Sequence, residues 1–408
     1  TVDVGETYRA GDVPGSITTA DIDRDGNPDL VWANDDNSSL GCTVTALRGR
    51  GDGTFIAGND YLLDLGEFTS VHLSDLNLDG KFDLTATRNN GGLYALLGNG
   101  DGTFGSPQSV STPAIPTAHA IGDLNGDGRP DAAVCVSQVV KVFINQVGPA
   151  IFSAGTDYPT GSYPKSVAIG DLNLDGKADL VVANFGATVS VLLGNGDGTF
   201  RPKRDFGTGR YPCHVTIGDL NGDGRQDLVL PNEWINWNRV SVLLGNGDGS
   251  FRIKSDYWTG ASPHGVAIGD LDRDGTTDLA TVNYMDNTAT VLIGAGNGSF
   301  GPGTSFASGD FPVFVAVGDL NGDRKLDLAV ANAAMYTRNN ASISVFLGDG
   351  NGGFGARTDY EAEEPWSVAI GDMNNHGSPD LVAPNSNAGT VSVFLNTSGP
   401  TPVAASLV

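Results

Sequence analysis

The chain has 408 residues, of which 58 are glycine and 20 are proline, and 39% of the chain is hydrophobic. This apolar fraction is enough for a sizeable core, which excludes a disordered polymer. Asp and Glu total 48 against 23 Lys and Arg, so the formal charge of −25 argues against nucleic acid and anionic membrane surfaces as partners.

Neither a membrane-spanning segment nor a secretory leader is visible. No apolar run approaches the roughly 18 residues that a membrane helix requires, and Thr1 follows no basic and apolar leader. We therefore expect a mature or excised soluble segment without membrane insertion. Three cysteines, Cys42, Cys135 and Cys213, are too few for a disulfide scaffold, and their pairing stays open.

An acidic nine-residue pattern, Asp-x-[Asp/Asn]-x-Asp-Gly-x-x-Asp, recurs along the chain. The copies lie 48 to 54 residues apart and start at Asp21, Asp75, Asp123, Asp171, Asp219, Asp270 and Asp319, with a degenerate eighth at Asp372. Repetition at this period indicates one supersecondary unit copied eight times.

The fourth unit shows the pattern of elements most clearly. A short apolar run at 166–170 precedes the acidic loop at 171–179, and a second run follows at 180–183. A third run at 189–193 leads into the Gly-rich turn 194–200 and a more polar segment that ends near residue 207. β-Branched residues fill the runs without a 3.6-residue period, so each unit is predicted to form four short strands and little helix.

The two ends of the chain favour a closed ring over an open stack. The last unit stops after its third strand at 391–395, whereas residues 1–11 resemble the outer strand of another unit. We therefore predict an all-β fold: a single eight-bladed β-propeller of four-stranded blades, closed by the N-terminal strand. The propeller is expected to span residues 1–397, with 398–408 as a tail or linker.

The acidic loops have the composition of a hard-cation site. Calcium takes six to eight oxygen ligands, and acids at loop positions 1, 3, 5 and 9 converge when glycine allows a sharp turn at position 6. About seven calcium sites are thus predicted. Their candidate ligands are Asp21, Asp23, Asp25, Asp29; Asp75, Asn77, Asp79, Asp83; Asp123, Asn125, Asp127, Asp131; Asp171, Asn173, Asp175, Asp179; Asp219, Asn221, Asp223, Asp227; Asp270, Asp272, Asp274, Asp278; and Asp319, Asn321, Asp323, Asp327.

Two loops depart from the pattern. The seventh has Arg324 where the others have glycine, which predicts a strained turn and a lower affinity. The eighth, which starts at Asp372, places His376 at position 5, and calcium disfavours a nitrogen ligand. We expect the eighth loop to be empty or weak.

Two other interpretations of the acidic loops remain. Asp-Gly segments form Asx turns for purely conformational reasons, although turns do not need acids at positions 1, 5 and 9 together. Paired acids also serve glycosidases, but a feature that recurs in every unit is better explained by scaffolding than by seven active sites.

The repeat resembles the FG-GAP/VCBS family, which also forms the head of integrin α-subunits. The matching text is IGDLNLDG at 169–176, ADL at 178–180 and LGNGDGTF at 193–200, and the likeness covers essentially the whole chain. The resemblance implies an extracellular calcium-binding propeller acting in adhesion or ligand recognition. Eight units in place of the seven of integrins put an integrin-like partner in doubt, and some eight-bladed propellers are polysaccharide lyases.

The two faces of such a ring differ in sequence. Acidic loops and Gly-rich turns share one face and are nearly constant, whereas the opposite face varies from unit to unit. Large or titratable side chains stand there where the repeat does not require them, and aromatic faces beside polar groups suit sugars or peptide side chains. The predicted ligand-binding residues are Tyr211, His214, Trp234, Trp237, His264, Tyr284 and Trp366.

Two classes of function follow. The first is a secreted or cell-surface calcium-binding module, expected to be monomeric, that binds a glycan or an extracellular protein. The second is a carbohydrate-active enzyme, such as a polysaccharide lyase, with its site on the same face. His214 and His264, with Tyr211 and Lys165, are the only plausible acid/base set, and no nucleophile elbow, zinc motif or phosphate loop accompanies them.

Overall fold

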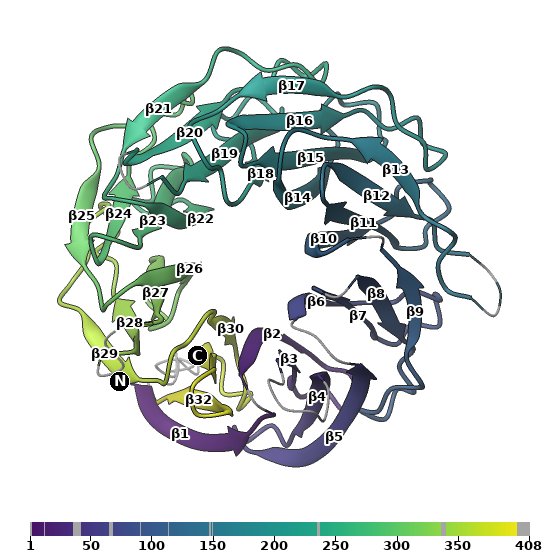
Figure 1. Cartoon of the computed structure of the whole chain (residues 1–408). Coiled ribbons are helices and arrows are strands. Elements are labelled where there is room, and N and C mark those ends of the chain that lie inside the picture. The colour runs from purple at the N-terminus through teal and green to yellow at the C-terminus, as the bar shows by residue number, and fades with distance from the viewer. Residues whose placement is uncertain are drawn as a thin grey trace, which may run out of the picture.

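The computed structural model describes residues 2–11, 13–35, 42–64, 68–89, 91–112, 114–146, 148, 150–234, 237–335 and 340–397. Its strands form eight four-stranded antiparallel sheets, arranged as blades around one axis (Figure 1). The predicted all-β, eight-bladed propeller is confirmed. Over these residues no helix has the length and apolar character needed to cross a bilayer. The predicted tail, 398–408, lies outside the described residues.

Each blade runs from an inner strand near the axis to an outer strand at the rim. The inner strands of blades 1 to 8 are β2 (Pro14–Ala20), β6 (Phe68–Ser74), β10 (Pro116–Gly122), β14 (Pro164–Gly170), β18 (Thr216–Gly218), β22 (Pro263–Gly269), β26 (Pro312–Gly318) and β30 (Ala369–Gly371). The second strands are β3 (Asp29–Asn34), β7 (Asp83–Arg88), β11 (Asp131–Val136), β15 (Asp179–Asn184), β19 (Asp227–Asn232), β23 (Asp278–Asn283), β27 (Asp327–Asn332) and β31 (Asp380–Asn385).

The third and fourth strands complete the blades. The third strands are β4 (Cys42–Gly49), β8 (Gly92–Leu96), β12 (Val139–Phe143), β16 (Thr188–Leu192), β20 (Arg239–Leu243), β24 (Thr288–Leu292), β28 (Ser342–Phe346) and β32 (Thr390–Asn396). The outer strands are β5 (Phe55–Asp64), β9 (Gln108–Ser111), β13 (Thr156–Pro159), β17 (Arg204–Gly207), β21 (Ser255–Trp258), β25 (Thr304–Ala307), β29 (Thr358–Glu361) and β1 (Val2–Arg9).

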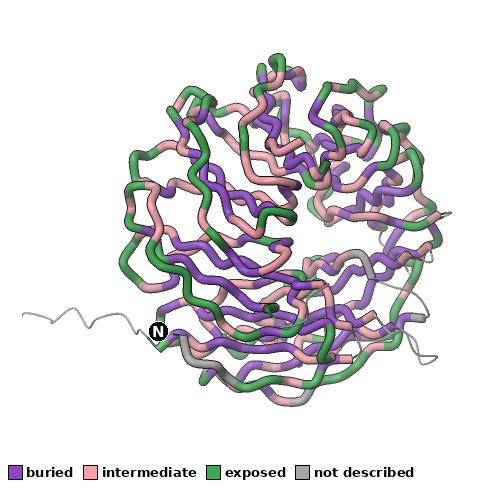
Figure 2. Tube along the Cα trace, turned by 60° about the vertical axis from the view of Figure 1, so that its left-hand side comes forward, coloured by how far each residue is buried: buried purple, intermediate pink, exposed green. Residues whose placement is uncertain are grey.

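The core lies between the blades. The second strand of every blade is buried along its whole length, whereas the outer strands are mostly exposed or half-buried (Figure 2). At six of the eight seams, adjacent blades are joined by an edge-to-face aromatic pair between an outer strand and the next blade's Gly-rich turn. Tyr257 and Phe300 form one such pair, with ring centroids 5.2 Å apart. Edge-to-face packing of this kind adds about 0.5–1.5 kcal/mol to the burial itself.

The N-terminal strand closes the ring as predicted. β1 pairs antiparallel with β32, from Val2 opposite Asn396 to Arg9 opposite Thr390. Tyr8 then makes with Phe55 of blade 1 the contact that joins other neighbouring blades, with centroids 5.4 Å apart and planes at 82°. The Tyr8 hydroxyl also accepts the Phe55 amide proton at 3.0 Å. Blade 8 is therefore held to blade 1 by the ordinary inter-blade interaction.

Deleting residues 1–11 should leave β32 as an unpaired sheet edge and remove the Tyr8–Phe55 contact. We expect a protein that aggregates or unfolds at a much lower temperature, because an exposed edge strand is a template for intermolecular pairing. Light scattering and thermal melting measure both effects. Deletion of residues 398–408 is the length-matched control. A soluble 12–408 protein with an unchanged melting temperature would contradict closure by β1.

Candidate metal loops and ligand-binding face

The acidic loops join the inner strand of each blade to the second strand, as the sequence predicted. Position 9 of each loop is the first residue of the second strand, for example Asp29 of β3 and Asp179 of β15. The Asp171 carboxylate at position 1 accepts the amide protons of Asp175 and Gly176 at 3.2 and 2.8 Å. The chain is thereby wrapped around position 1.

The position 9 aspartate makes a second, more deeply buried set of bonds. Asp179 is 0% exposed, and its two oxygens accept the amide protons of Leu172 and Gly194 at 2.9 and 2.7 Å. One donor lies in the acidic loop and the other just after the third strand, so the carboxylate ties the two together. All eight blades repeat this arrangement, at Asp29, Asp83, Asp131, Asp179, Asp227, Asp278, Asp327 and Asp380.

Burial dominates the electrostatics of position 9. It raises the pKa of Asp29, Asp131 and Asp179 to about 6, although the two amide hydrogen bonds of each carboxylate act in the opposite direction. Neighbouring carboxylates of the loop raise these pKa values further. A bound cation would relieve this unfavourable charge.

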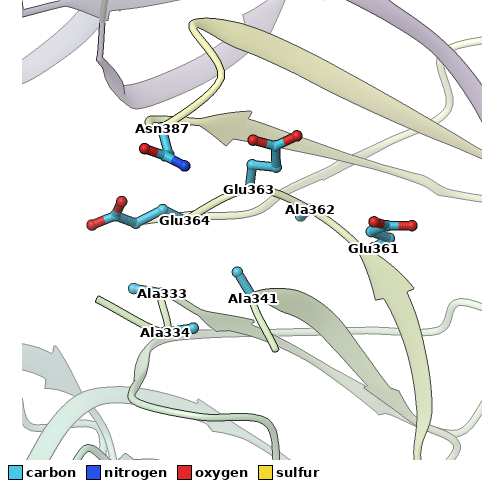
Figure 3. A pocket seen from close by; sticks show the side chains of 8 residues that line it. All are labelled: Ala333, Ala334, Ala341, Glu361, Ala362, Glu363, Glu364 and Asn387. Atoms are coloured by element: carbon cyan, nitrogen blue, oxygen red, sulfur yellow. The ribbon is translucent and has the colours of Figure 1, made fainter. Parts of the chain in front are cut away.

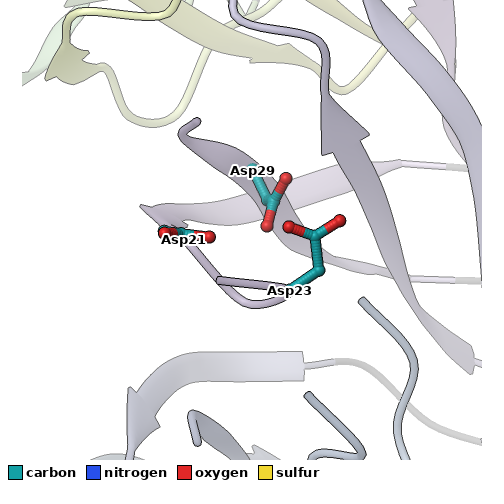
Figure 4. A group of neighbouring side chains, drawn as sticks. All are labelled: Asp21, Asp23 and Asp29. Atoms are coloured by element: carbon teal, nitrogen blue, oxygen red, sulfur yellow. The ribbon is translucent and has the colours of Figure 1, made fainter. Parts of the chain in front are cut away.

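Two loops bring three carboxylates together. In loop 1, Asp21, Asp23 and Asp29 each place an oxygen within 4.8 Å of the others (Figure 4). In loop 6 the same is true of Asp270, Asp272 and Asp278. These are the loops with aspartate at position 3, where the five other predicted sites have asparagine. Both clusters could hold a metal ion through carboxylate oxygens.

The position 5 aspartates form Asx turns. An oxygen of Asp175 accepts the amide proton of Lys177 at 3.0 Å, and Asp25 and Asp274 do the same with Asn27 and Thr276. Asp25 and Asp274 therefore stand outside the three-carboxylate groups, although both were predicted as ligands. The turn occupies one carboxylate oxygen at position 5. In several loops the second oxygen is engaged as well: Asp175 Oδ2 accepts from Asn173 Nδ2 at 3.2 Å, and Asp79 Oδ2 accepts from Lys81 Nζ at 3.0 Å.

The two unusual loops keep the backbone course of the others. Arg324 has a φ of 65°, a left-handed value that residues other than glycine rarely adopt. Its amide still donates to the Asp319 carboxylate at 2.8 Å. In loop 8, His376 Nδ1 lies 3.4 Å from the Asp372 carboxylate, and Nε2 faces the Asn396 carbonyl oxygen. The histidine thus bonds within the fold.

Position 4 has a backbone requirement that the sequence analysis missed. Arg24, Leu78 and Leu174 occupy it with φ between 60° and 64°, and three other loops place glycine there. Gly126, Gly222 and Gly322 stand at this position in the sequence, and their recurrence could have predicted the left-handed conformation. The loops therefore contain two left-handed residues, which bends the chain tightly enough to gather positions 1, 3 and 5.

On the opposite face, which we call the variable face, residues far apart in sequence meet at the inner end of the blades. An inner cavity of about 380 Å³ is lined by Cys213, His214, His264, Val313, Phe314 and Trp366, from blades 5 to 8. Three of the seven predicted ligand-binding residues, His214, His264 and Trp366, are thereby brought together. Although His214 keeps an exposed edge, the side chains around its imidazole desolvate the ring and lower its pKa, and a positive charge on the neighbouring His264 would lower it further.

A second aromatic group lies beside the inner cavity. Tyr211 stacks on Trp234 with centroids 4.7 Å apart and planes within 9°, and its edge meets Phe185. The Lys165 ammonium lies over the Phe185 ring, with Nζ 4.8 Å from the ring centroid. Tyr211 and Lys165 are therefore engaged with aromatic rings and do not line the cavity that holds the two histidines.

Tyr284 and Trp237 have separate surroundings. Tyr284 packs on Phe311, with its ring 6.3 Å from that of His264. Trp237 instead lies against Arg239, whose guanidinium covers the Trp258 ring at 3.9 Å. Trp258, in outer strand β21, is 63% exposed and was not singled out from sequence. The Trp237 ring thus lies toward the rim of blade 5, and its link to the predicted residues is a backbone one: its amide donates to the Trp234 carbonyl oxygen at 2.7 Å.

Another cavity, of about 290 Å³, opens between blades 7 and 8. Figure 3 shows Glu363, Glu364 and Asn387 on one side of it and alanine side chains on the other. The Glu363 amide donates to Asn385 Oδ1 at 3.0 Å, and the Asn387 amide donates to the Glu363 carbonyl at 3.3 Å. The acidic side chains of this cavity belong to the segment that connects β29 of blade 7 to β30 of blade 8.

The two other histidines, His72 and His119, pack together within the fold. The His72 and His119 rings meet edge to face at 4.5 Å, and His119 bonds to Ser70, Thr85 and Thr87.

Comparison with known families agrees with this architecture. The FG-GAP-like repeat matches residues 21–86, 75–134, 123–182, 171–230, 234–281 and 270–330, and five of these six matches begin at the first aspartate of an acidic loop. The chain belongs to the FG-GAP repeat family. A search of curated protein sequences returns no match.

Solved structures share the propeller fold of this FG-GAP protein at low sequence identity. Saccharomyces cerevisiae Sqt1 aligns with a TM-score of 0.70 and 9% identity over 97% of this chain and 99% of Sqt1. An Agrocybe aegerita lectin that recognises non-reducing terminal N-acetylglucosamine aligns at 0.52 and 19% identity over 91% and 99%. BBS1N, solved in complex with ARL6DN, aligns at 0.54 and 14% identity over 81% and 93%.

The position 9 carboxylate should stabilise the FG-GAP blade even without metal. In Asp179→Asn, the amide NH₂ would face one of the two buried backbone N–H donors and leave it unpaired. We expect a loss of about 1–3 kcal/mol in the free energy of unfolding, measured by urea denaturation in EDTA. Asp175→Asn is the matched control, because an asparagine oxygen can still accept the Lys177 amide proton. Equal effects of the two variants would contradict a distinct role for position 9.

Proposed function

We propose that this FG-GAP propeller is an extracellular, calcium-stabilised recognition module that binds a glycan on its variable face. The observation that carries the proposal is the convergence of Trp366, His214 and His264 on one inner cavity. These residues come from three blades, and nothing in the repeat requires them. Concave sites that combine aromatic walls with a few polar groups are the usual form of ligand sites.

Calcium as the metal is supported by the chemistry of the loops. All the side-chain donors of the seven predicted sites are carboxylate or amide oxygens, which hard cations prefer. Burial raises the pKa of Asp23 and Asp272 at position 3, and nearby loop carboxylates raise it further, so an unfilled cluster is electrostatically unfavourable. Seven divalent ions would reduce the formal charge from −25 to −11.

An extracellular location is supported by the same loops. Their position 3 and 5 side chains are half-buried or exposed, and open loops of this kind suit the millimolar calcium outside cells. Cys135 is a buried thiol, and burial raises the pKa of the Cys135 and Cys213 thiols above the ordinary value. Their low reactivity is compatible with an oxidising compartment.

A glycan is favoured as ligand over a protein by the size and shape of the site. The aromatic residues line a cavity, whereas a protein partner would need a broad surface. The likeness to a lectin supports the same choice, and the likeness to a protein-binding propeller keeps a protein ligand as the alternative.

Recognition is favoured over polysaccharide lysis by the cavity lining. Elimination from a uronic acid requires the carboxylate of the sugar to be neutralised, and among the residues that the structure describes no lysine or arginine lines the inner cavity. Lys165 and Tyr211, the other members of the candidate acid/base set, lie with Phe185 and Trp234.

A glycan array probed with the calcium-loaded protein, and again after EDTA, tests the function. Mass analysis of each bound glycan after incubation distinguishes recognition from cleavage. Binding of intact glycan supports the proposal, whereas shortened products with a new double bond would establish the lyase.

Calcium should act as a folding ligand. A metal that binds only the native state stabilises it by about 2.7 kcal/mol per site at one hundred times Kd, so calcium should raise the melting temperature strongly above that in EDTA. Elemental analysis should find one fewer calcium in Asp171→Asn, whereas Asp372→Asn in the degenerate loop should leave the count unchanged. An unchanged melting temperature and no bound calcium would refute calcium binding.

Trp366 should contribute most of the aromatic binding energy. Trp366→Ala should weaken binding of a glycan identified on the array by about 1–3 kcal/mol, with little loss of stability because the side chain is 38% exposed. Trp258→Ala, at the outer rim, is the control, and isothermal titration calorimetry gives the affinity. If Trp366→Ala binds like the wild type while Trp258→Ala does not, the site lies at the rim.

A further inference from the structure

Trp366 stands between two cavities of different chemistry. On one side is the inner cavity, and on the other is a cavity of about 330 Å³ at the seam between blades 8 and 1, lined by Gly15, Ser16, Asp35, Ser367 and Ser386. We call the second one the seam cavity. Since Trp366 lines both, a single elongated ligand can fill them together.

The difference between the cavities follows from a break in the repeat. In seven blades a proline begins or precedes the inner strand, and in blade 2 Phe68 takes its place. The two residues that follow this position lie at the variable-face end of the blade. Most inner strands carry a β-bulge there. In blades 1 to 4 these residues are small or hydrophilic: Gly15–Ser16, Thr69–Ser70, Thr117–Ala118 and Lys165–Ser166. In blades 5 to 8 they are Cys213–His214, His264–Gly265, Val313–Phe314 and Trp366–Ser367. One half of the inner rim is therefore aromatic and apolar, and the other half is hydroxylated.

The inner cavity offers much apolar surface and few polar atoms. Phe314 is 40% exposed although it belongs to an inner strand, and Val313 and Val315 are buried around it. The Cys213 thiol is directed to the His264 carbonyl at 3.3 Å. A sugar ring buried here with all its hydroxyls would leave several without partners, at about 1–3 kcal/mol each. The buried group must therefore be mainly apolar.

His264 supplies one defined acceptor in the inner cavity. Its Nδ1 lies 2.9 Å from the Val313 carbonyl oxygen, so Nδ1 carries the proton and donates it. When the ring is neutral, this hydrogen bond selects the Nδ1–H tautomer, in which Nε2 has a lone pair that accepts a hydrogen bond. A ligand group with one N–H donor beside a methyl group matches this arrangement.

The seam cavity offers acceptors for hydroxyl groups. The Ser386 hydroxyl donates to the Pro14 carbonyl at 2.6 Å, and the Ser367 hydroxyl donates to the Gly15 carbonyl at 3.2 Å. Their protons are thus used within the fold, and their oxygens remain acceptors. Sugar hydroxyls are donors that suit these oxygens.

We propose that the ligand is an oligosaccharide with a 2-acetamido sugar, whose acetamido group enters the inner cavity while the adjoining sugar fills the seam cavity. This inference rests on the proposed glycan-binding function. The acetamido methyl packs against Phe314 and Val313, its N–H donates to His264 Nε2, and Trp366 stacks between the two sugars. Because neither cavity has a lysine or arginine among its described lining residues and the chain carries −25, the ligand is uncharged.

Calorimetry with tri-N-acetylchitotriose and cellotriose tests the assignment, since the two neutral trisaccharides differ in the acetamido group. We expect the acetylated sugar to bind about tenfold more tightly or better, because one methyl group in an apolar pocket is worth roughly 10- to 200-fold. Phe314→Ser, which gives blade 7 a residue of the hydroxylated half, should reduce this ratio. Leu347→Ser is the control, as it is similarly exposed in blade 7 but lies in the Gly-rich turn of the opposite face.

The outcomes separate this inference from the function on which it rests. Equal affinity for the two trisaccharides, or an unchanged ratio in a folded Phe314→Ser protein, overturns the acetamido assignment while glycan binding stands. Array ligands that all lack acetamido groups do the same. If the array yields no glycan ligand, both the glycan-binding function and the acetamido assignment are overturned. Displacement of the chitotriose by N-acetylphenylalanine amide at equal concentration would make the inner cavity a peptide site and also overturns the assignment.

Discussion

The buried carboxylate at the start of every second strand is the interaction on which the blade depends. Its two oxygens bind one amide of the acidic loop and one amide at the end of the third strand, as Asp179 does with Leu172 and Gly194. Blade 8 keeps this arrangement through Asp380 although its loop has lost the ligand pattern. Strand pairing and loop shape therefore rest on position 9, and the proposed calcium would bind to a turn that the backbone hydrogen bonds already organise.

Much of the fold could be predicted because eight copies of one unit show the same order of apolar runs, acidic loop and Gly-rich turn. The fourth unit was expected to have strands near 166–170, 180–183 and 189–193, and β14, β15 and β16 lie there. Spacing also located the candidate ligands, but it could not tell which oxygens the backbone would occupy. Hence Asp25 was expected beside Asp21 and Asp23, whereas its hydrogen bond to the Asn27 amide sets it apart.

The candidate ligand site could be predicted only in part, for a geometric reason. Strand order assigns a residue to a face of the ring but gives no distance from the axis. His264 lies at the start of inner strand β22 and Trp366 precedes inner strand β30, and the two meet in one cavity, whereas Trp237 follows a second strand and lies with Arg239 near the rim. Side-chain packing decides which of these residues meet near the axis and which lie near the rim, and sequence spacing does not encode that packing.

The pairing of β1 with β32 has a consequence for the order of synthesis. Residues 2–9 leave the ribosome before every other strand of the ring, but their partners at 390–396 leave it after all the others. The first strand must therefore remain unpaired while seven blades form, and the longest-range pairing of the ring is made at the end. A ring closed this way has no closed intermediate, so a product truncated before β32 would carry open sheet edges at both ends, and such edges distinguish it from the closed ring for quality-control proteases.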